Sequence, residues 1–192
     1  MKKLEPVFLS ASIPHREPYV HNSDPLLIRE AILALVAVVV RSRELVFGGH
    51  PAISPLVDHA SRTLNAQDNF YIYQSRWFED VIPEVAKNFK NLIWTDKRYS
   101  REESLTLMRT EMIGSRSFGA AVFIGGMEGI VEECEIFKKL HPDKPIFPVA
   151  STLGAALELF NAGEGPQDDF IREELRANKR YRGLFRKILE EM

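Results

Sequence analysis

Residues 120–133 read AAVFIGGMEGIVEE, an apolar run that passes through two glycines into a helical pattern. The run from Ala120 to Ile124 is continuously apolar, which is typical of a strand buried on both faces of a parallel sheet. Gly125 and Gly126 end this strand, and helical spacing continues from about Ile130 to Leu140. A strand that turns directly into a helix is half of a βαβ unit, so this stretch predicts an α/β fold.

The same alternation extends outward over the chain. Short apolar strands are predicted at 7–9, 45–47, 70–73, 92–94, 120–124 and 145–149. Helices are predicted at 24–43, 54–64, 78–89, 100–115, 130–140, 154–160 and 170–191. Strands separated by helices of ten or more residues require crossover connections. The pattern therefore predicts a Rossmann-like three-layer α/β/α sandwich with a mainly parallel central sheet of about six strands.

Composition excludes several classes of protein. The chain has 192 residues, 25 Lys and Arg against 27 Asp and Glu, and a formal net charge of −2. This balance lacks the basic signature of a nucleic-acid-binding protein. The single Cys134 excludes an internal disulfide and favours a reducing compartment. The apolar run Ala31 to Val40 is about half the length that spans a bilayer. We therefore predict a cytoplasmic protein that binds neither nucleic acid nor membrane.

Three strand ends carry residues that let the backbone approach an anion. They are Ser10-Ala11-Ser12, Gly48-Gly49-His50 and the run Gly125 to Gly129. Glycine has no Cβ, and a helix N-terminus adds unpaired N–H groups, so such ends can hold a phosphate. Paired glycines also make tight turns with no ligand at all. Because three such ends meet at one edge of a parallel sheet, we expect a nucleotide-like ligand there. No GxGxxG fingerprint and no Walker A loop is present.

Residues 108–133 then resemble the SLOG superfamily, which unites LOG phosphoribohydrolases, DprA and ligand-sensing domains of bacterial defence systems and TRPM channels. LOG enzymes carry an arginine helix, a strand and the motif Pro-Gly-Gly-x-Gly-Thr-x-x-Glu. Aligning the double glycines places Arg109 on the family's catalytic arginine and Glu132 on its catalytic glutamate. The segment 47–51 resembles the family's first glycine loop. The resemblance covers about residues 6–159 and implies a nucleotide-binding Rossmann-like domain.

Three positions depart from the enzyme motif. Ile124 replaces the proline, Glu128 the third glycine and Gly129 the threonine. If Glu128 lies in a one-residue bulge, Gly129 recovers the third glycine and Glu133 becomes the aligned acid. The altered motif looks more like the sensor branches associated with TIR and other effectors, which implies binding of a nucleotide-derived, ADP-ribose-like signal.

Each candidate residue has a structural alternative. Arg109 can bind phosphate through its guanidinium fork or lie in solvent beside Arg101 and Arg116. Glu132 or Glu133 can bind ribose hydroxyls, stabilise an oxocarbenium ion, or only favour the helix dipole. The expected ligand contacts are Ser10, Ser12, Arg16, Gly48, Gly49, His50, Arg109, Gly125, Gly126, Met127, Glu128, Gly129 and Glu132. If the protein is an enzyme, the expected catalytic residues are Arg109, Glu132 and Glu133.

The loop after the first strand gathers His15, Arg16, Tyr19 and His21, which can close over a base and phosphate or lie on the surface. The scattered histidines show no metal-ligand spacing, so no metal and no cofactor are predicted. We expect residues 1–162 to form the nucleotide-binding domain and 163–192 a helical extension that packs on it or on a partner subunit. The resemblance further implies a homodimer or higher oligomer, with an effector protein as a possible partner.

Three functions remain open at this point. The first is sensing of a nucleotide or nucleotide-derived signal at the carboxyl ends of the strands. The second is hydrolysis of the N-glycosidic bond of nucleoside monophosphates, which the spacing of Arg109 and Glu132 favours. The third is a structural or interaction module with a degenerate pocket. Glu128 inside the glycine motif favours the first over the second.

Overall fold

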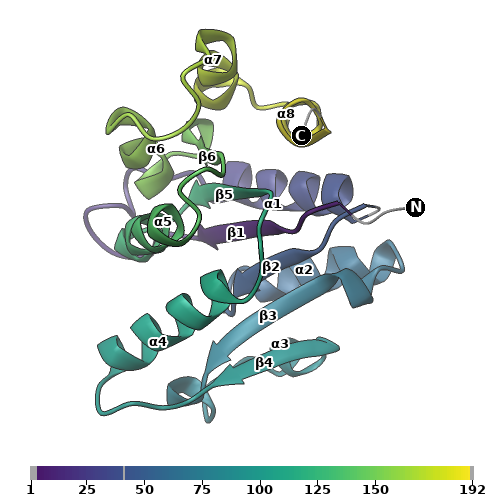
Figure 1. The fold of residues 1–192 in the computed structure, drawn as a ribbon, viewed down its shortest axis with the longest axis vertical. Helices are drawn as coiled ribbons and strands as arrows, with labels where there is room; N and C mark the ends of the chain where they lie inside the picture. The colour runs from purple at the N-terminus through teal and green to yellow at the C-terminus, as the bar shows by residue number, and fades with distance from the viewer. Residues whose placement is uncertain (1–3, 41, 191–192) are drawn as a thin grey trace.

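A six-stranded sheet forms the centre of the computed structural model, which describes residues 4–40 and 42–190 (Figure 1). The strand order is β4-β3-β2-β1-β5-β6, and every neighbouring pair is parallel. Its strands are β1 (Val7–Ser12), β2 (Leu45–Gly48), β3 (Phe70–Ser75), β4 (Asn91–Thr95), β5 (Ala120–Gly125) and β6 (Ile146–Val149). The Rossmann-like fold is therefore confirmed, and the sheet is entirely rather than mainly parallel.

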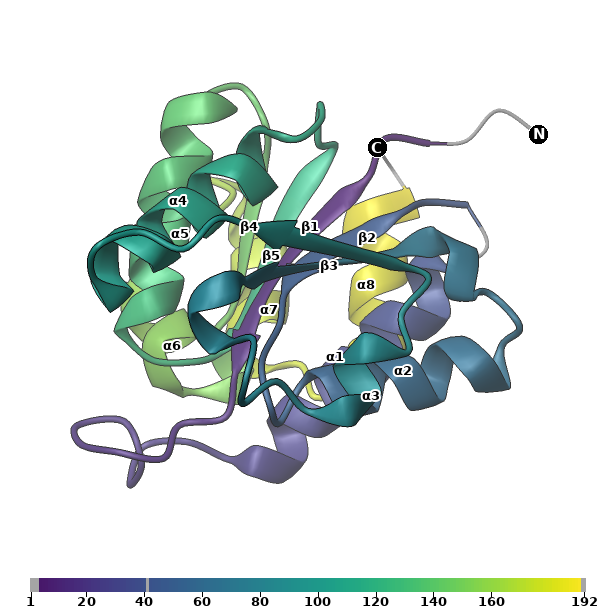
Figure 2. The same cartoon turned by 90° about the horizontal axis from the view of Figure 1, so that it is seen from below.

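Helices cover both faces of this sheet. They are α1 (Pro25–Val39), α2 (Ser54–Thr63), α3 (Glu84–Lys87), α4 (Arg101–Gly114), α5 (Glu128–Leu140), α6 (Gly154–Asn161), α7 (Asp169–Ala177) and α8 (Tyr181–Glu190). Short 3-10 helices occupy Gln67–Asn69, Arg76–Phe78 and Ala150–Thr152. Figure 2 shows α4, α5 and α6 on one side of the sheet and α1, α2 and α8 on the other. Among the described residues, no helix is both long and apolar enough to cross a membrane.

The central strand β1 shows how the two faces are filled. Successive side chains of a strand point to opposite faces. Val7 and Leu9 pack into the cluster that contains α1, α2 and α8, whereas Phe8 packs into the cluster that contains α4 and α5. The Phe8 ring stacks on Phe137 of α5 at a centroid distance of 5.8 Å. Both faces of β1 are thus covered over Val7–Leu9, which explains the apolar start of this strand.

Helix α1 is entirely apolar from Ala31 to Val39, and each of these residues is buried or half-buried. Asp24 caps it by accepting hydrogen bonds from the N–H groups of Leu26 and Leu27, and Pro25 fills the first turn. One side of α1 packs on the sheet, and α8 packs on another, burying Leu184 and Phe185. The proposed division of the chain at residue 162 stays a prediction.

Two predicted helices differ from the observed ones. The helix expected at 78–89 is wrong: a turn follows Phe78, and only Glu84–Lys87 is α-helical. Pro83 has no N–H to donate and restricts the residue before it, so the helix begins only after it. The helix expected at 170–191 is two helices, and position 191 lies outside the described residues. Asn178 breaks the run, because its side chain accepts a hydrogen bond from the Arg180 N–H at 2.7 Å.

Candidate functional site

A cleft with a volume of about 850 Å³ opens at the carboxyl ends of β1 and β2. It lies beside the point where β1 leads into α1 on one face of the sheet and β5 leads towards α5 on the other. In open parallel sheets such a switch point is where ligands bind. The end of β1, the loop after β2, helix α4, the start of α5 and the loop after β3 all contribute side chains.

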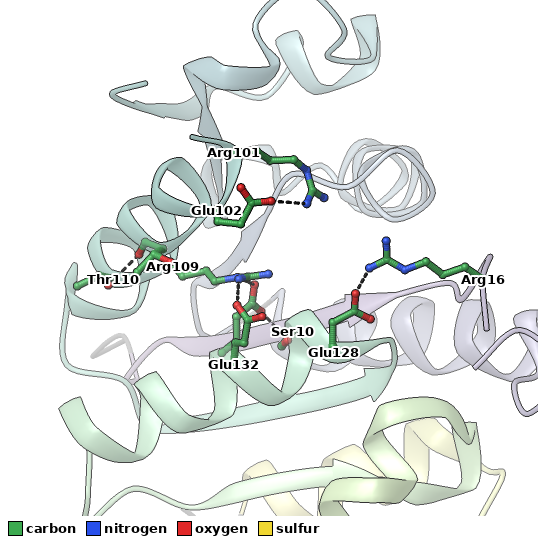
Figure 3. Close-up of polar contacts among 10 residues, drawn as sticks. Ser10, Arg16, Arg101, Glu102, Arg109, Thr110, Glu128 and Glu132 are labelled. Atoms are coloured by element: carbon green, nitrogen blue, oxygen red, sulfur yellow. Dashed lines mark hydrogen bonds and ion pairs between the residues drawn. The ribbon is translucent and has the colours of Figure 1, made fainter. Parts of the chain in front are cut away.

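Arg109 on α4 reaches across this cleft to α5 (Figure 3). Its neighbours Met108 and Met112 are buried under the helix and hold this face of α4 towards the sheet. The Arg109 guanidinium forms an ion pair with Glu132, and its Nε lies 3.5 Å from Oε1 of Glu133. Only 12% of the Arg109 side chain is exposed, and its buried Nε has no hydrogen-bond partner among the described residues. The buried Nε therefore faces the Glu133 carboxylate rather than the open cleft.

Gly129 makes room for this arginine. A Cβ built at residue 129 would lie 2.7 Å from Nη2 of Arg109, which is closer than real Cβ contacts. Gly129 is the second residue of α5, and the first N–H groups of a helix have no partner within that helix. The guanidinium thus lies beside the N-terminal turn of α5, where two sources of positive potential meet.

The two adjacent glutamates of α5 have different surroundings. Glu133 is nearly buried and accepts a hydrogen bond of 2.5 Å from the Ser10 hydroxyl at the end of β1. Burial raises the pKa of the Glu133 carboxyl, although Arg109 and Ser10 favour its charged form. The Glu132 side chain is 55% exposed. The buried acid of the cluster is therefore Glu133, and Glu132 covers Arg109 from the solvent side.

A second ion pair crosses the mouth of the cleft. Arg16, in the loop after β1, pairs with Glu128 at the start of α5, and both side chains are about half exposed (Figure 3). The same loop brings His15 into the cleft lining. Its other two candidates have different partners: the Tyr19 hydroxyl donates to Glu158 at 2.9 Å, and His21 pairs with Glu17 at 3.0 Å. Neither Tyr19 nor His21 lines the cleft.

The turn after β2 lines the cleft but uses part of its backbone internally. The Gly49 N–H donates to the Tyr73 carbonyl at 2.8 Å, which extends the pairing of β2 with β3. The Nδ1 atom of His50 accepts a hydrogen bond from the Ala52 N–H at 3.2 Å. Burial, with a smaller contribution from His15, lowers the pKa of His50 to about 4, so this imidazole is neutral at pH 7. Gly48 and Ser12 also line the cleft.

Gly125 and Gly126 lie outside the cleft lining. The Gly125 N–H donates to the Thr152 hydroxyl at 2.8 Å, and the Gly126 N–H donates to the Ser12 carbonyl at 2.9 Å. Both N–H groups are thus bonded within the protein, and the expected anion contact with this glycine pair stays a prediction. Of the predicted run, residues 127–129 do line the cleft.

The apolar end of the cleft is not among the site residues predicted from the sequence. The described lining includes Phe78, Val81, Ile82, Pro83 and Ala86, all from the segment between β3 and β4. Val81 is 73% exposed, and the Arg101 guanidinium carbon lies 5.9 Å from the centroid of the Phe78 ring. The sequence signal that could have indicated this segment is Pro83, because a proline inside a helical pattern argues for an irregular segment that can present side chains to a ligand.

Comparisons with known proteins agree with this architecture. The sequence matches the family model described as the SLOG cluster3 family over residues 18–189. No curated protein matches the chain. Among solved structures, the X-ray structure of TM1055 from a structural genomics consortium is similar, with a TM-score of 0.62 and 14% sequence identity. The match covers 98% of this chain and 100% of that chain, and at this identity it shows the fold alone.

Proposed function

The chain belongs to the SLOG cluster3 family, and on that premise we propose that it binds a nucleotide or nucleotide-derived signal of the ADP-ribose type. The predicted resemblance to the SLOG superfamily is thereby confirmed, whereas the ligand is our inference. The observation that carries it is Arg109, which lines the cleft and lies largely buried beside the first turn of α5. A guanidinium in this setting suits a phosphate, because its planar fork pairs with phosphate oxygens.

The shape of the cleft supports a ligand with two unlike ends. Its volume of about 850 Å³ falls in the range of small-molecule sites. One end, called here the charged end, consists of Ser10, Arg16, Arg109, Glu128, Glu132 and Glu133. The other is the apolar end around Phe78 and Val81, which offers an aromatic ring and aliphatic groups to a base. A nucleotide has this division between a charged part and a planar apolar part.

Arg109→Ala tests the proposal. Loss of one charge-assisted contact costs about 1.5–3 kcal/mol, so nucleotide affinity should fall about tenfold to over a hundredfold. The fold should survive, because Met108 and Met112 still fill the core below. Calorimetric titration with a panel of nucleotides that includes ADP-ribose measures the effect. Arg176→Ala is the matched control, since Arg176 forms an exposed pair with Glu173 on α7 outside the cleft.

Two outcomes would contradict the proposal. A well-folded wild type whose melting temperature no nucleotide raises would favour a structural module with a degenerate pocket, because a ligand at 100 times its Kd should add about 2.7 kcal/mol. Unchanged affinity in a folded Arg109→Ala variant would remove Arg109 from the site. The loop that holds His15 and Arg16 would then be the next candidate.

A LOG-like hydrolase is the second candidate function, and the environment of Glu133 favours it. A nearly buried carboxyl with a raised pKa, hydrogen-bonded to Ser10 and close to Arg109, suits proton transfer or charge stabilisation at a glycosidic bond. Incubation with AMP distinguishes the two functions. Release of free adenine that is lost in Glu133→Gln and kept in Glu135→Gln would establish the enzyme and contradict sensing as the main role.

The partners remain predictions. We expect self-association to at least a homodimer, as the resemblance implies, and an effector protein as a further partner. Light scattering at micromolar concentration tests the first expectation, and a clean monomer would contradict it.

A further inference from the structure

Each arginine that lines the cleft already has a carboxylate partner in the same lining. Arg16 pairs with Glu128, and Arg109 pairs with both Glu132 and Glu133. The Nη1 atom of Arg101 lies 3.6 Å from Oε1 of Glu102. Three arginines thus face four glutamates, and the low pKa of His50 keeps that imidazole uncharged at pH 7. A bound anion must therefore displace or approach carboxylates of the protein, and net positive potential alone does not attract it.

Glu128 lies where an anion would approach the first turn of α5. It is the first residue of α5, where the helix dipole favours negative charge, and its carboxylate already supplies that charge. It also lines the cleft and holds Arg16 across the opening (Figure 3). Any phosphate that reaches the N-terminal turn of α5 meets the Glu128 carboxylate at the same place.

The charge of a phosphate depends on its esterification. A terminal phosphate monoester carries about −1.5 to −2 at pH 7, whereas a phosphate esterified on both sides carries about −1. Repulsion by a fixed carboxylate grows with that charge. A sugar on the far side of the phosphate also brings hydroxyl groups. The half-exposed carboxylates of Glu128 and Glu132 can accept hydrogen bonds from these hydroxyl groups.

We infer that Glu128 is a specificity-determining residue of the cleft. It favours nucleotides whose terminal phosphate is capped by a hydroxyl-rich group over nucleotides whose terminal phosphate is free. The inference rests on the proposed function and narrows its ligand class. It also predicts that the cleft disfavours nucleoside monophosphates, the substrates of the alternative hydrolase. Arg16 is the positioning partner, because it fixes the Glu128 carboxylate at the mouth of the cleft.

ADP-ribose and ADP are a matched ligand pair, because they differ only in the ribose that caps the terminal phosphate. Calorimetry on the full chain should give ADP-ribose an affinity about tenfold or more above that of ADP. In Glu128→Gln the affinity for ADP-ribose should exceed that for ADP by about threefold or less. The main reason is that ADP binds more tightly once the carboxylate charge is removed. Glu135→Gln should keep the wild-type ratio, since Glu135 lies on the same helix outside the cleft and pairs with Lys138. Glu128→Ser gives a second variant with the same charge change.

The outcomes separate the inference from the proposed function. Equal or tighter binding of ADP by the wild type would overturn the inference while it supports nucleotide binding. An affinity ratio that stays unchanged in both Glu128→Gln and Glu128→Ser would also overturn it. Failure of both ligands to bind the wild type and both variants would instead overturn the proposed function, and the inference with it.

Discussion

The turn Gly125–Gly126 and the first turn of α5 lie next to each other in the sequence, yet they have different roles in the structure. The N–H groups of the glycine turn are bonded within the protein, to the Thr152 hydroxyl and the Ser12 carbonyl. The first turn of α5 faces the cleft and holds Glu128 and Gly129 beside two arginines. Both stretches carry glycine, but one serves packing and the other keeps space open for a charged side chain.

The difference shows that the N–H groups of a glycine pair can be bonded within the fold while a neighbouring glycine lines the cleft. At residue 126, φ is +85°, and an added Cβ would lie 1.7 Å from Cδ1 of Ile130. At residue 129 the nearest atom is the end of a flexible arginine. A substitution at the first position should therefore affect folding, whereas one at the second should affect binding. The next predictions test this contrast, from the largest expected effect to the smallest.

Gly126→Ala should have the largest effect, and on stability. An L side chain at a left-handed position costs about 1–2 kcal/mol, and overpacking against Ile130 adds to it, so we expect a loss of about 2–4 kcal/mol in the free energy of unfolding. Urea denaturation measures it. Gly183→Ala is the control: it lies in α8 with open space around it and should gain up to about 1 kcal/mol. Equal stability of wild type and Gly126→Ala would contradict a packing role for the turn.

Gly129→Ala should change affinity more than stability. The new Cβ would displace the Arg109 guanidinium, so nucleotide binding should weaken by about threefold to tenfold. The free energy of unfolding should change by less than about 1 kcal/mol, because the displaced group is the end of a flexible side chain. Titration and urea denaturation of one preparation measure both quantities. A large loss of stability without a loss of affinity would reverse the contrast between the two turns.

The smallest effect concerns pH and Glu133. The pKa of Glu133 is raised in the folded protein, so the folded state holds this proton more tightly than the unfolded chain does. The wild type should therefore gain stability relative to Glu133→Gln as the pH falls through the raised folded pKa of Glu133, and lose it as the pH rises again. Urea denaturation across this range measures the difference. Glu135→Gln, which changes an exposed carboxyl, should show no such trend relative to the wild type.

The fold could be predicted because its signals are local. Continuous apolar strands and the Asp24-Pro25 helix start indicated the alternation that the structure confirms. The prediction failed where one residue outweighed an apolar pattern. Pro83 delays a helix that the periodicity favoured, and the Asn178 side chain breaks another by bonding to the backbone of Arg180.

The sequence by itself determined the parallel α/β layers, the edge of the sheet where the cleft lies, and Arg109 and the start of α5 as its neighbours. Only the tertiary structure decided which of two adjacent glutamates is buried, which N–H groups are already bonded, and that Arg16 pairs with Glu128. The physical reason is the separation along the chain over which each kind of interaction acts. Periodicity and turn chemistry act over a few residues, whereas burial and ion pairing join residues that are far apart in the chain, such as Ser10 and Glu133, which are 123 residues apart.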